Sequence, residues 1–261
     1  SYVLKEFANI VTSNNVHVIG LAPTHKAKMA LASEGFECVD TVKGMLFKLA
    51  NGRFNLPKHS VLVLDEAGMV GNDDYKELLR VAATRQCNVI LSMDEKQLTS
   101  VQRGGMGEVF ADRYGSSTIL DIKRQDSNWG RSVAMSMSNG CVETGISILE
   151  QENRVKWSSD AESSMQSLLS DWNKSDYAIG DRVILAVRNK DVVALNHGVR
   201  EYLKMNGKLT GEEIAVGGNH YMKGDRILIT KTNKELGVIN GDIAEIRAVS
   251  KDEFTIRFVS D

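Results

Sequence analysis

The sequence predicts an α/β fold built on doubly wound parallel sheets. Short, continuously apolar segments such as "VLVL" and "VIGLA" recur along the chain, and amphipathic helical segments alternate with them. A strand that is apolar at every position is buried on both faces, as it is in a parallel sheet covered by helices. Ligands of such folds gather at the carboxyl ends of the strands. We therefore expect a functional site where these apolar segments end.

The elements of the first half follow in order. Apolar residues at helical spacing predict a helix over residues 3–11, and "NNVHVIGLA" predicts a turn that leads into a strand. "PTHKAKMALASEG" predicts a loop and a helix closed by Gly35, with Thr24 as a candidate N-cap. "SVLVL" and "NVILSM" predict two further strands, separated by a helix that begins near residues 72–74.

The second half is expected to repeat this pattern before it changes character. "GGMGEVFADRYG" and "STILDI" continue the alternation, and residues 127–174 are mainly helical. "RVILAV" predicts a new strand and "KDVVALNHGVREYLKMNG" a helix, which together indicate a second α/β unit. From residue 225 on, alternating strands and turn signals such as Asn240-Gly241 predict a small β-barrel or β-meander.

Composition excludes several classes of protein. With 42% hydrophobic and 25% charged residues, the chain is globular, and its longest apolar runs are far shorter than a membrane span of about 18 residues. The first residues lack the basic start of a signal peptide. Cys38, Cys87 and Cys141 are too widely separated for a disulfide framework or a Cys-x-x-Cys metal site. We expect a cytoplasmic protein without membrane insertion.

Charge and histidine spacing limit the kinds of site. The formal net charge of -2 excludes adhesion to nucleic acid through bulk positive charge, so phosphate binding must come from locally clustered Lys and Arg. The five histidines show no metal-ligand spacing, which favours surface or satisfied core positions for each of them.

Two adjacent acids follow the most apolar segment, in "VLVLDEAGMV" at residues 61–70. Burying an unpaired charge costs several kcal/mol, so both Asp65 and Glu66 must reach solvent, a metal ion or cations. In a nucleotide triphosphatase, the first acid can hold magnesium through its water shell, while the second orients or deprotonates the attacking water. Alone, the pair is more typical of a helix cap or a solvated turn.

Neighbouring segments strengthen the catalytic interpretation. "NVILSM" runs into "MDEKQL", so adjacent parallel strands would bring Asp94 and Gln97 to the same sheet edge as the acidic pair. The amide of Gln97 both donates and accepts hydrogen bonds, which suits the sensing of a γ-phosphate. Arg124 follows another apolar segment and could spread transition-state charge. The alternatives are an ordinary loop glutamine and a surface arginine.

The ordered set "LAPTHKA", "VLVLDEAGMV", "MDEKQLTSVQRGG" and "IKRQ" resembles motifs Ia, II, III and IV of RecD-like superfamily 1B DNA helicases. "LDEAGMVG" and "IKRQDSNWGRSVA" are similar to the helicase part of Ti-plasmid-type conjugal transfer relaxases (TraA). The resemblance is strongest over residues 16–140 and moderate over "LAVRNKDVVALNHGVREYL". It extends weakly to "KGDRILITKTNKELGVINGDIAEI", which resembles the DNA-contacting β insertion of the second motor domain.

The resemblance implies a P-loop NTPase (RecA-like) fold with two motor domains, both incomplete. It divides the chain into a first motor domain at 1–118, part of a second at 119–215 and an SH3-like insertion at 216–261. It implies ATP and Mg²⁺ as cofactors, single-stranded DNA as partner, and the conjugation machinery as the setting of the full-length protein.

Residue roles carried over from the family fall into two groups. For hydrolysis, the resemblance implies a catalytic base at Glu66, a γ-phosphate sensor at Gln97 and an arginine finger at Arg124. For the magnesium nucleotide, it implies contacts from Ser1, Asp65 and Asp94, with Mg²⁺ held through Asp65 and Ser1.

Contacts with single-stranded DNA are implied for a further set of residues: Thr24, His25, Lys26, Lys28, Lys231 and Lys234. Hydroxyl groups and cations directed at phosphates suit such contacts. For Thr24, a purely structural role as a helix cap is an equal alternative.

Some parts of the family pattern are missing. The phosphate-binding loop Gly-x-x-x-x-Gly-Lys-Ser/Thr is absent, and Ser1 stands where its last residue would be, so we expect the Gly and Lys just upstream and a fragment at both ends. Motif III departs from the family pattern at Met93, Thr99 and Ser100.

From the ordered motifs, the chain is interpreted as the motor segment of a relaxase-helicase. The alternative is a vestigial helicase-like module that binds single-stranded DNA without ATPase activity. A phosphotransferase explains the acids but not the ordered motifs.

Overall fold

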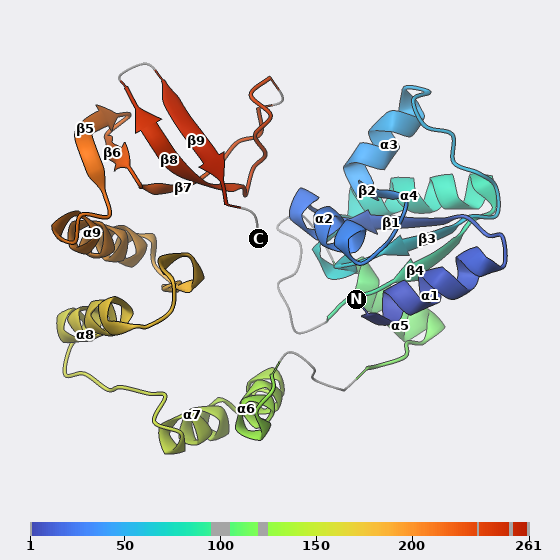
Figure 1. The fold of residues 1–261 in the computed structure, drawn as a ribbon. Helices are drawn as coiled ribbons and strands as arrows, with labels where there is room; N and C mark the ends of the chain where they lie inside the picture. The colour runs from blue at the N-terminus through green and yellow to red at the C-terminus, as the bar shows by residue number, and fades with distance from the viewer. Residues whose placement is uncertain (1, 95–104, 120–124, 234, 251–252, 260–261) are drawn as a thin grey trace. The chain divides into compact units, whose positions relative to one another are not determined.

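The computed structural model describes residues 2–94, 105–119, 125–233, 235–250 and 253–259. The chain forms two compact units, residues 1–145 and 146–261, and each is described by itself (Figure 1). Ser1, Gln97, Arg124 and Lys234 lie outside the described residues, so the roles expected of them stay predictions.

A parallel sheet forms the centre of the first unit. Its described strands lie in the order β2-β1-β3-β4, and every neighbouring pair is parallel. Their bounds are Val39–Thr41 for β2, Val18–Ala22 for β1, Val61–Leu64 for β3 and Asn88–Leu91 for β4. Leu64 of β3 pairs with Leu21 and with Leu91, so three strands end level with one another. The predicted α/β class with a parallel sheet is confirmed.

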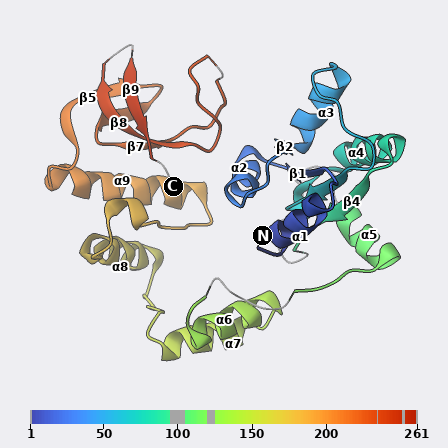
Figure 2. The ribbon, with the colours of Figure 1, turned by 45° about the vertical axis from the view of Figure 1, so that its right-hand side comes forward.

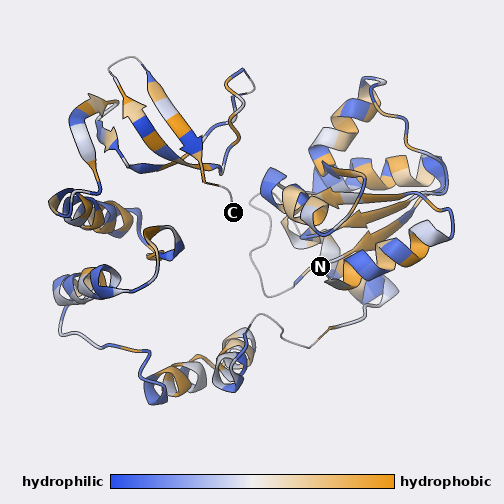
Figure 3. Cartoon of the chain, viewed as in Figure 1, coloured by the Kyte–Doolittle hydropathy of each residue, from blue (hydrophilic) through white to orange (hydrophobic). Residues whose placement is uncertain are grey.

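Helices cover both faces of this sheet (Figures 1 and 2). All of β3 is buried, and its side chains alternate between the two faces. Leu62 and Leu64 pack with residues of α3 (Val42–Ala50) and α4 (Asn72–Arg85), whereas Val61 and Val63 pack with residues of α1 (Tyr2–Ser13) and α2 (His25–Ser33). Strand β3 is accordingly apolar along its length (Figure 3). The sheet is doubly wound, as the sequence predicts.

Local sequence signals set where the helices begin. Thr24 and Thr41 are the N-caps of α2 and α3, and the hydroxyl oxygen of each accepts a hydrogen bond from a backbone N–H in the first turn. Asp73 and Asp74 in the first turn of α4 complement the helix dipole. The remaining helices of the first unit are α5 (Met106–Tyr114) and α6 (Asn128–Ser138), and α7 (Val142–Gln151) spans the division between the units.

The second unit combines two helices with small antiparallel sheets. In α8 (Ala161–Lys174) and α9 (Asn189–Met205), Trp172 meets Tyr202 edge to face at 6.4 Å between ring centroids. Strands β5 (Thr210–Val216) and β6 (Asn219–Lys223) form a hairpin. Strands β7 (Arg226–Leu228), β8 (Ile243–Val249) and β9 (Phe254–Phe258) form a meander, with the turn at Asn240-Gly241 between β7 and β8. The predicted helical stretch over 127–174 and the β-meander are confirmed.

Two predicted strands do not form as expected. Residues 182–187 pair with no described strand, and the side chains of Val183, Leu185 and Val187 are 77%, 86% and 101% exposed. A strand needs a neighbour to take up its backbone hydrogen bonds, and the described part of the second unit offers this segment none. Of the predicted strand at 117–122, residues 117–119 are irregular and the rest lie outside the described residues. The described residues of the second unit therefore contain no parallel sheet.

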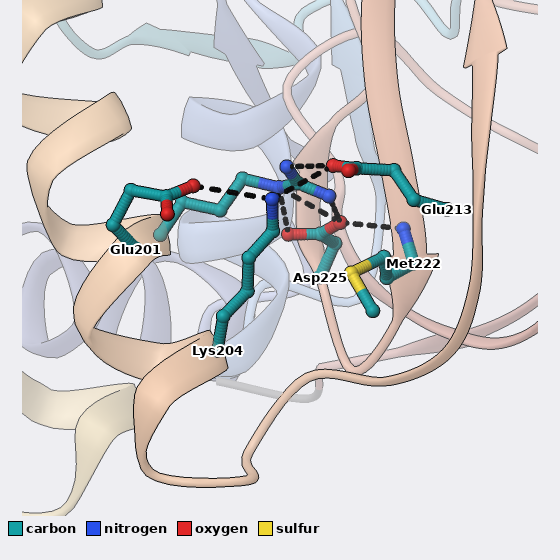
Figure 4. A network of polar contacts seen from close by, with 6 residues as sticks. Glu201, Lys204, Glu213, Met222 and Asp225 are labelled. Carbon is teal, nitrogen blue, oxygen red and sulfur yellow. Dashed lines mark hydrogen bonds and ion pairs between the residues drawn. The ribbon is translucent and has the colours of Figure 1, made fainter.

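An ion-pair network centred on Arg200 joins α9 to the β-rich part of the second unit (Figure 4). The Arg200 guanidinium donates to both carboxylate oxygens of Asp225, in the turn between β6 and β7, at 3.0–3.2 Å. It also donates to Glu213 on β5. Because the Arg200 and Asp225 side chains are only 18% and 12% exposed, solvent screens this pair less than a surface pair.

The remaining members of the network complete its hydrogen bonding. Lys204, one turn along α9, lies 3.0 Å from the carboxylate of Glu213 and 3.1 Å from that of Glu201. Asp225 also accepts the Met222 N–H at 2.7 Å. The two carboxylates facing Arg200 are thus paired from several sides, which is the condition for a half-buried ion pair to be tolerated.

We predict that Arg200→Met lowers the free energy of unfolding of the second unit by about 2–3 kcal/mol, because Asp225 and Glu213 lose their shared partner. Urea denaturation followed by tryptophan fluorescence measures the effect. Arg188→Met is the matched control, since Arg188 forms an exposed pair with Asp191 and its loss should have a much smaller effect. Equal effects of the two substitutions would contradict the role of the network.

A pH dependence follows from Glu213. Hydrogen bonds from Arg200 and Lys204 lower the pKa of Glu213 from 4.5 to about 2. A depressed pKa contributes stability that is fully present above pH 4.5 and is lost as the pH falls through about 2. Urea midpoints measured between pH 6 and pH 3 should therefore fall less steeply in Glu213→Gln than in the unsubstituted chain. Identical slopes would contradict this assignment.

Candidate active site

The ladder between β3 and β4 contains an extra residue at the position where β3 ends. Ser92 donates its N–H to the Leu64 carbonyl at 2.8 Å, and its carbonyl accepts the N–H of Ala67 at 2.9 Å. In a regular parallel ladder, the second bond would come from residue 66, two positions after Leu64. Asp65 still follows the regular pattern on the other side, donating to Leu21 at 2.9 Å. Glu66 is therefore the inserted residue of a bulge, a device that re-aims side chains.

The backbone of Glu66 adopts a left-handed conformation, with φ 50° and ψ 40°. For a residue other than glycine this conformation costs about 1–2 kcal/mol, and it persists only where the surrounding structure enforces it. Such conformations concentrate at functional sites. The residue that the resemblance assigns as the catalytic base thus has a left-handed backbone at this edge of the sheet.

Both acids are half-exposed between buried neighbours. Leu64 and Ala67 are fully buried on either side of them. Within the residues that the structure describes, neither carboxylate forms a hydrogen bond or an ion pair. Glu66 precedes the short 3₁₀ helix η1 (Ala67–Met69) without capping it, and the N-cap of α4 is Gly71. The alternative that the acids act as helix caps is therefore not supported by the contacts.

Of the other residues expected to contact the nucleotide or to act in its hydrolysis, the structure describes only Asp94. Asp94 lies three residues past the end of β4, at the same sheet edge as Asp65 and Glu66, and is exposed. Ser1, Gln97 and Arg124 lie outside the described residues. Met93, one of the departures from the family motif, packs against α5, where a methyl group placed on Gly107 would lie 2.3 Å from the Met93 Sδ atom. The missing side chain at Gly107 thus makes room for Met93.

The expected DNA contacts follow β1 at the same edge. Thr24 is exposed and caps α2, with its Oγ1 accepting the Ala27 N–H at 3.2 Å. This contact confirms the structural role that the sequence allows for Thr24, and it leaves the hydroxyl proton available to a ligand. His25 is half-exposed, Lys26 is exposed, and Lys26 has no ion pair with another described residue.

Lys28 differs from Lys26 because a carboxylate already faces it. Asp40, whose side chain is 15% exposed, lies 3.8 Å from Lys28 Nζ and 2.7 Å from Lys48 Nζ. Asp40 also accepts the N–H of Thr41 at 2.8 Å. The charge of Lys28 is therefore partly neutralised within the protein. Lys231 is exposed, in the segment between β7 and β8 of the second unit.

The two carboxylates at this edge, those of Asp65 and Glu66, can bind a metal ion only if a second molecule supplies further ligands. The described residues contain no group of three or more His, Cys, Asp or Glu side chains that could hold a metal ion. Magnesium, however, commonly takes only one or two carboxylates from the protein and its other ligands from water and substrate phosphates. Asp65 and Glu66 fit that arrangement and do not fit an all-protein metal cage.

The fold and this edge define a class of protein: an α/β domain of the P-loop NTPase type. Residues 1–160, more than half of the chain, match the family model described as AAA domain. The chain belongs to the AAA domain family.

Particular relatives sharpen the comparison. The chain is 28% identical over 234 residues to the conjugal transfer protein TraA of Rhizobium radiobacter, and 28% identical over 233 residues to that of Agrobacterium fabrum. Each alignment covers 88% of this chain and 21% of the relative, so the chain spans about a fifth of the length of these proteins. The similarity to TraA that the motifs predict is confirmed.

Solved structures with partial similarity include Pif1 helicases. Bacteroides Pif1 bound to single-stranded DNA is 14% identical over 98% of this chain and 65% of its own, with a TM-score of 0.49. A second Pif1 structure, from a study of unwinding at forked DNA, is 16% identical over 97% of this chain and 67% of its own, with a TM-score of 0.48. Both scores are below 0.5, so the assignment rests on the family match. None of the described helices is long and apolar enough to span a membrane.

Sequence reasoning missed three residues that shape this edge: Tyr75, Gly107 and Asp40. Tyr75 donates its hydroxyl to the Ala67 carbonyl, Gly107 makes room for Met93, and Asp40 faces Lys28. Each acts through a contact between different elements of the fold, and no local motif indicates it. Only Tyr75 gives a sequence signal: it occupies a core-facing position of α4 where an apolar residue would suffice, so its hydroxyl requires a hydrogen-bond partner.

Proposed function

We propose that the chain is part of an ATP-driven helicase or translocase that acts on single-stranded DNA during conjugative plasmid transfer. The observation that carries this proposal is the bulge at Glu66. It presents two adjacent carboxylates at the carboxyl edge of a doubly wound sheet, unpaired among the described residues and at the cost of backbone strain.

The two acids would divide the chemistry of hydrolysis. Mg²⁺ bound to ATP would supply charge neutralisation at the phosphates, and Asp65 would hold that ion through its water shell. Glu66 would orient the attacking water and accept its proton. Gln97 as the γ-phosphate sensor, Arg124 as the cation at the developing charge, and Ser1 and Asp94 as nucleotide contacts complete the proposed site.

Single-stranded DNA would meet the same face of the first unit at the start of α2. The N–H groups of the first helical turn carry a partial positive charge and attract phosphate. Thr24, His25 and Lys26 lie at this helix start, and Lys26 adds an uncompensated charge. In the second unit, Lys231 and Lys234 would add contacts from the segment between β7 and β8.

A DNA-binding module without ATPase activity is the second candidate. The departures from the family motif at Met93, Thr99 and Ser100 favour it. Against it, the Met93 side chain is accommodated beside Gly107, and the bulge at Glu66 is intact. The departure at Met93 therefore does not require a loss of hydrolysis.

We predict that Glu66→Gln leaves nucleotide binding within about twofold and lowers turnover by about 10²-fold or more, because the amide cannot accept the proton of the attacking water. The measurement is DNA-stimulated ATP hydrolysis by the full-length protein. Glu108→Gln, on α5, is the matched control for loss of one carboxylate. Unchanged turnover in Glu66→Gln would refute the assigned base. Absence of hydrolysis in the unsubstituted protein, with DNA binding intact, would favour the second candidate.

We predict that Lys26→Ala weakens binding of an oligothymidylate more than Lys28→Ala, because Asp40, which it shares with Lys48, already partly neutralises the Lys28 charge. Fluorescence anisotropy over a range of salt concentrations measures this. Lys26→Ala should reduce the slope of log affinity against log salt by up to about 0.7, the value for one single-strand phosphate contact, and Lys28→Ala by less. A larger effect at Lys28, or a salt-independent affinity, would count against this surface.

A further inference from the structure

One buried polar group next to the acidic turn has no part in the proposed chemistry. The side chain of Tyr75 on α4 is 1% exposed and is among the largest fully buried side chains of the described residues. Its hydroxyl donates a hydrogen bond to the Ala67 carbonyl at 2.8 Å. Burial raises the pKa of Tyr75 to about 12, so the hydroxyl keeps its proton over the physiological range. An apolar residue would fill this core position without the need to satisfy a hydroxyl.

The residue that Tyr75 holds is the one directly after Glu66. The N–H of Ala67 forms the bond to Ser92 that closes the bulge, and its carbonyl receives the Tyr75 hydroxyl and, at 3.1 Å, the Val70 N–H. Ala67 is thereby fixed on both sides of its Cα atom. Since the left-handed backbone of Glu66 must join Asp65 to this fixed residue, the hold on Ala67 restricts the direction of the Glu66 side chain.

The ring of Tyr75 is itself held in place by α5. The ring of Phe110 lies 5.9 Å from it, centroid to centroid, in a tilted arrangement. A methyl group placed on Gly107 would lie 3.7 Å from the Tyr75 hydroxyl and far closer to Met93, so the backbone of α5 lies near both side chains. The packing of the ring thus restricts the Tyr75 hydroxyl to the Ala67 carbonyl as its hydrogen-bond acceptor.

We propose that Tyr75 is a positioning residue that fixes the Glu66 turn through its hydrogen bond to Ala67. This inference rests on the proposed function for the role of Glu66, and on geometry alone for the hold on the turn. Removal of the hydroxyl leaves the fold in place and loosens the turn, so the catalytic step slows while ATP binding is retained.

The first test uses Tyr75→Phe in the 261-residue chain, a change that keeps the ring and removes only the hydroxyl. Amide hydrogen exchange resolved by NMR should show the Ala67 N–H exchanging about tenfold faster or more, while Leu62 and Val63 in the middle of β3 stay within about threefold of their original rates. Tyr202→Phe is the matched control, because the Tyr202 hydroxyl also donates to a backbone carbonyl, that of Asn173 in the second unit, at 3.4 Å. It should leave Ala67 unchanged.

The second test measures the kinetics of DNA-stimulated ATP hydrolysis by the full-length protein. Tyr75→Phe should lower kcat by about tenfold or more with KM for ATP within about twofold, the pattern for an interaction that matters only in the transition state. Tyr202→Phe should leave both values within about twofold.

Each outcome decides one claim. An unchanged exchange rate at Ala67 in Tyr75→Phe overturns the inference whatever the activity. Faster exchange with an unchanged kcat also overturns it, because the turn would then be loosened without consequence. If the unsubstituted protein hydrolyses no ATP, the proposed function fails instead, and the exchange measurement still decides whether Tyr75 holds the turn.

Discussion

The hydrogen bond from the Ala67 N–H to the Ser92 carbonyl is the constraint on which the candidate site depends. Because this bond skips one residue of the regular ladder, Glu66 is excluded from the sheet and takes a left-handed conformation. In a regular strand, the side chains of Asp65 and Glu66 would point to opposite faces. Because of this bond, the two acids lie instead on either side of a bend in the backbone. The burial of β3 between two helix layers supplies the free energy that holds this bend in place.

The sequence predicts the frame of this site but not its detail. A strand as apolar as residues 61–64 has to be central, and the end-to-end register of parallel strands then places Asp65, Glu66 and Asp94 at one edge. The bulge itself depends on a contact between residues 25 positions apart and on a glutamate where a left-handed turn usually selects glycine, so no local signal predicts it. The same reasoning fails for residues 182–187, whose apolar pattern is right for a strand while no described segment pairs with them.

Electrostatic pairing separates side chains that look equivalent in the sequence. Lys26 and Lys28 are both part of "THKAK", yet only Lys28 faces Asp40, which lies in β2. In the second unit, the Arg200 side chain is paired with Asp225 and Glu213 and ties α9 to strand β5 and to the turn between β6 and β7. A count of charges thus overstates the positive surface open to a phosphate backbone. Exposure and partners, which only the fold determines, identify Lys26 as the more available cation.

If strain at Glu66 is maintained for chemistry and not for folding, stability should rise when it is relieved. The direct measurement is the free energy of unfolding of Glu66→Gly and Glu66→Ala in the 261-residue chain, by urea denaturation. Glycine accepts a left-handed backbone without the side-chain penalty, so Glu66→Gly should be more stable than Glu66→Ala by about 0.5–1 kcal/mol and no less stable than the unsubstituted chain. A loss of more than about 1 kcal/mol in Glu66→Gly, equal to or larger than the loss in Glu66→Ala, would show that the fold itself requires Glu66 and would contradict this account.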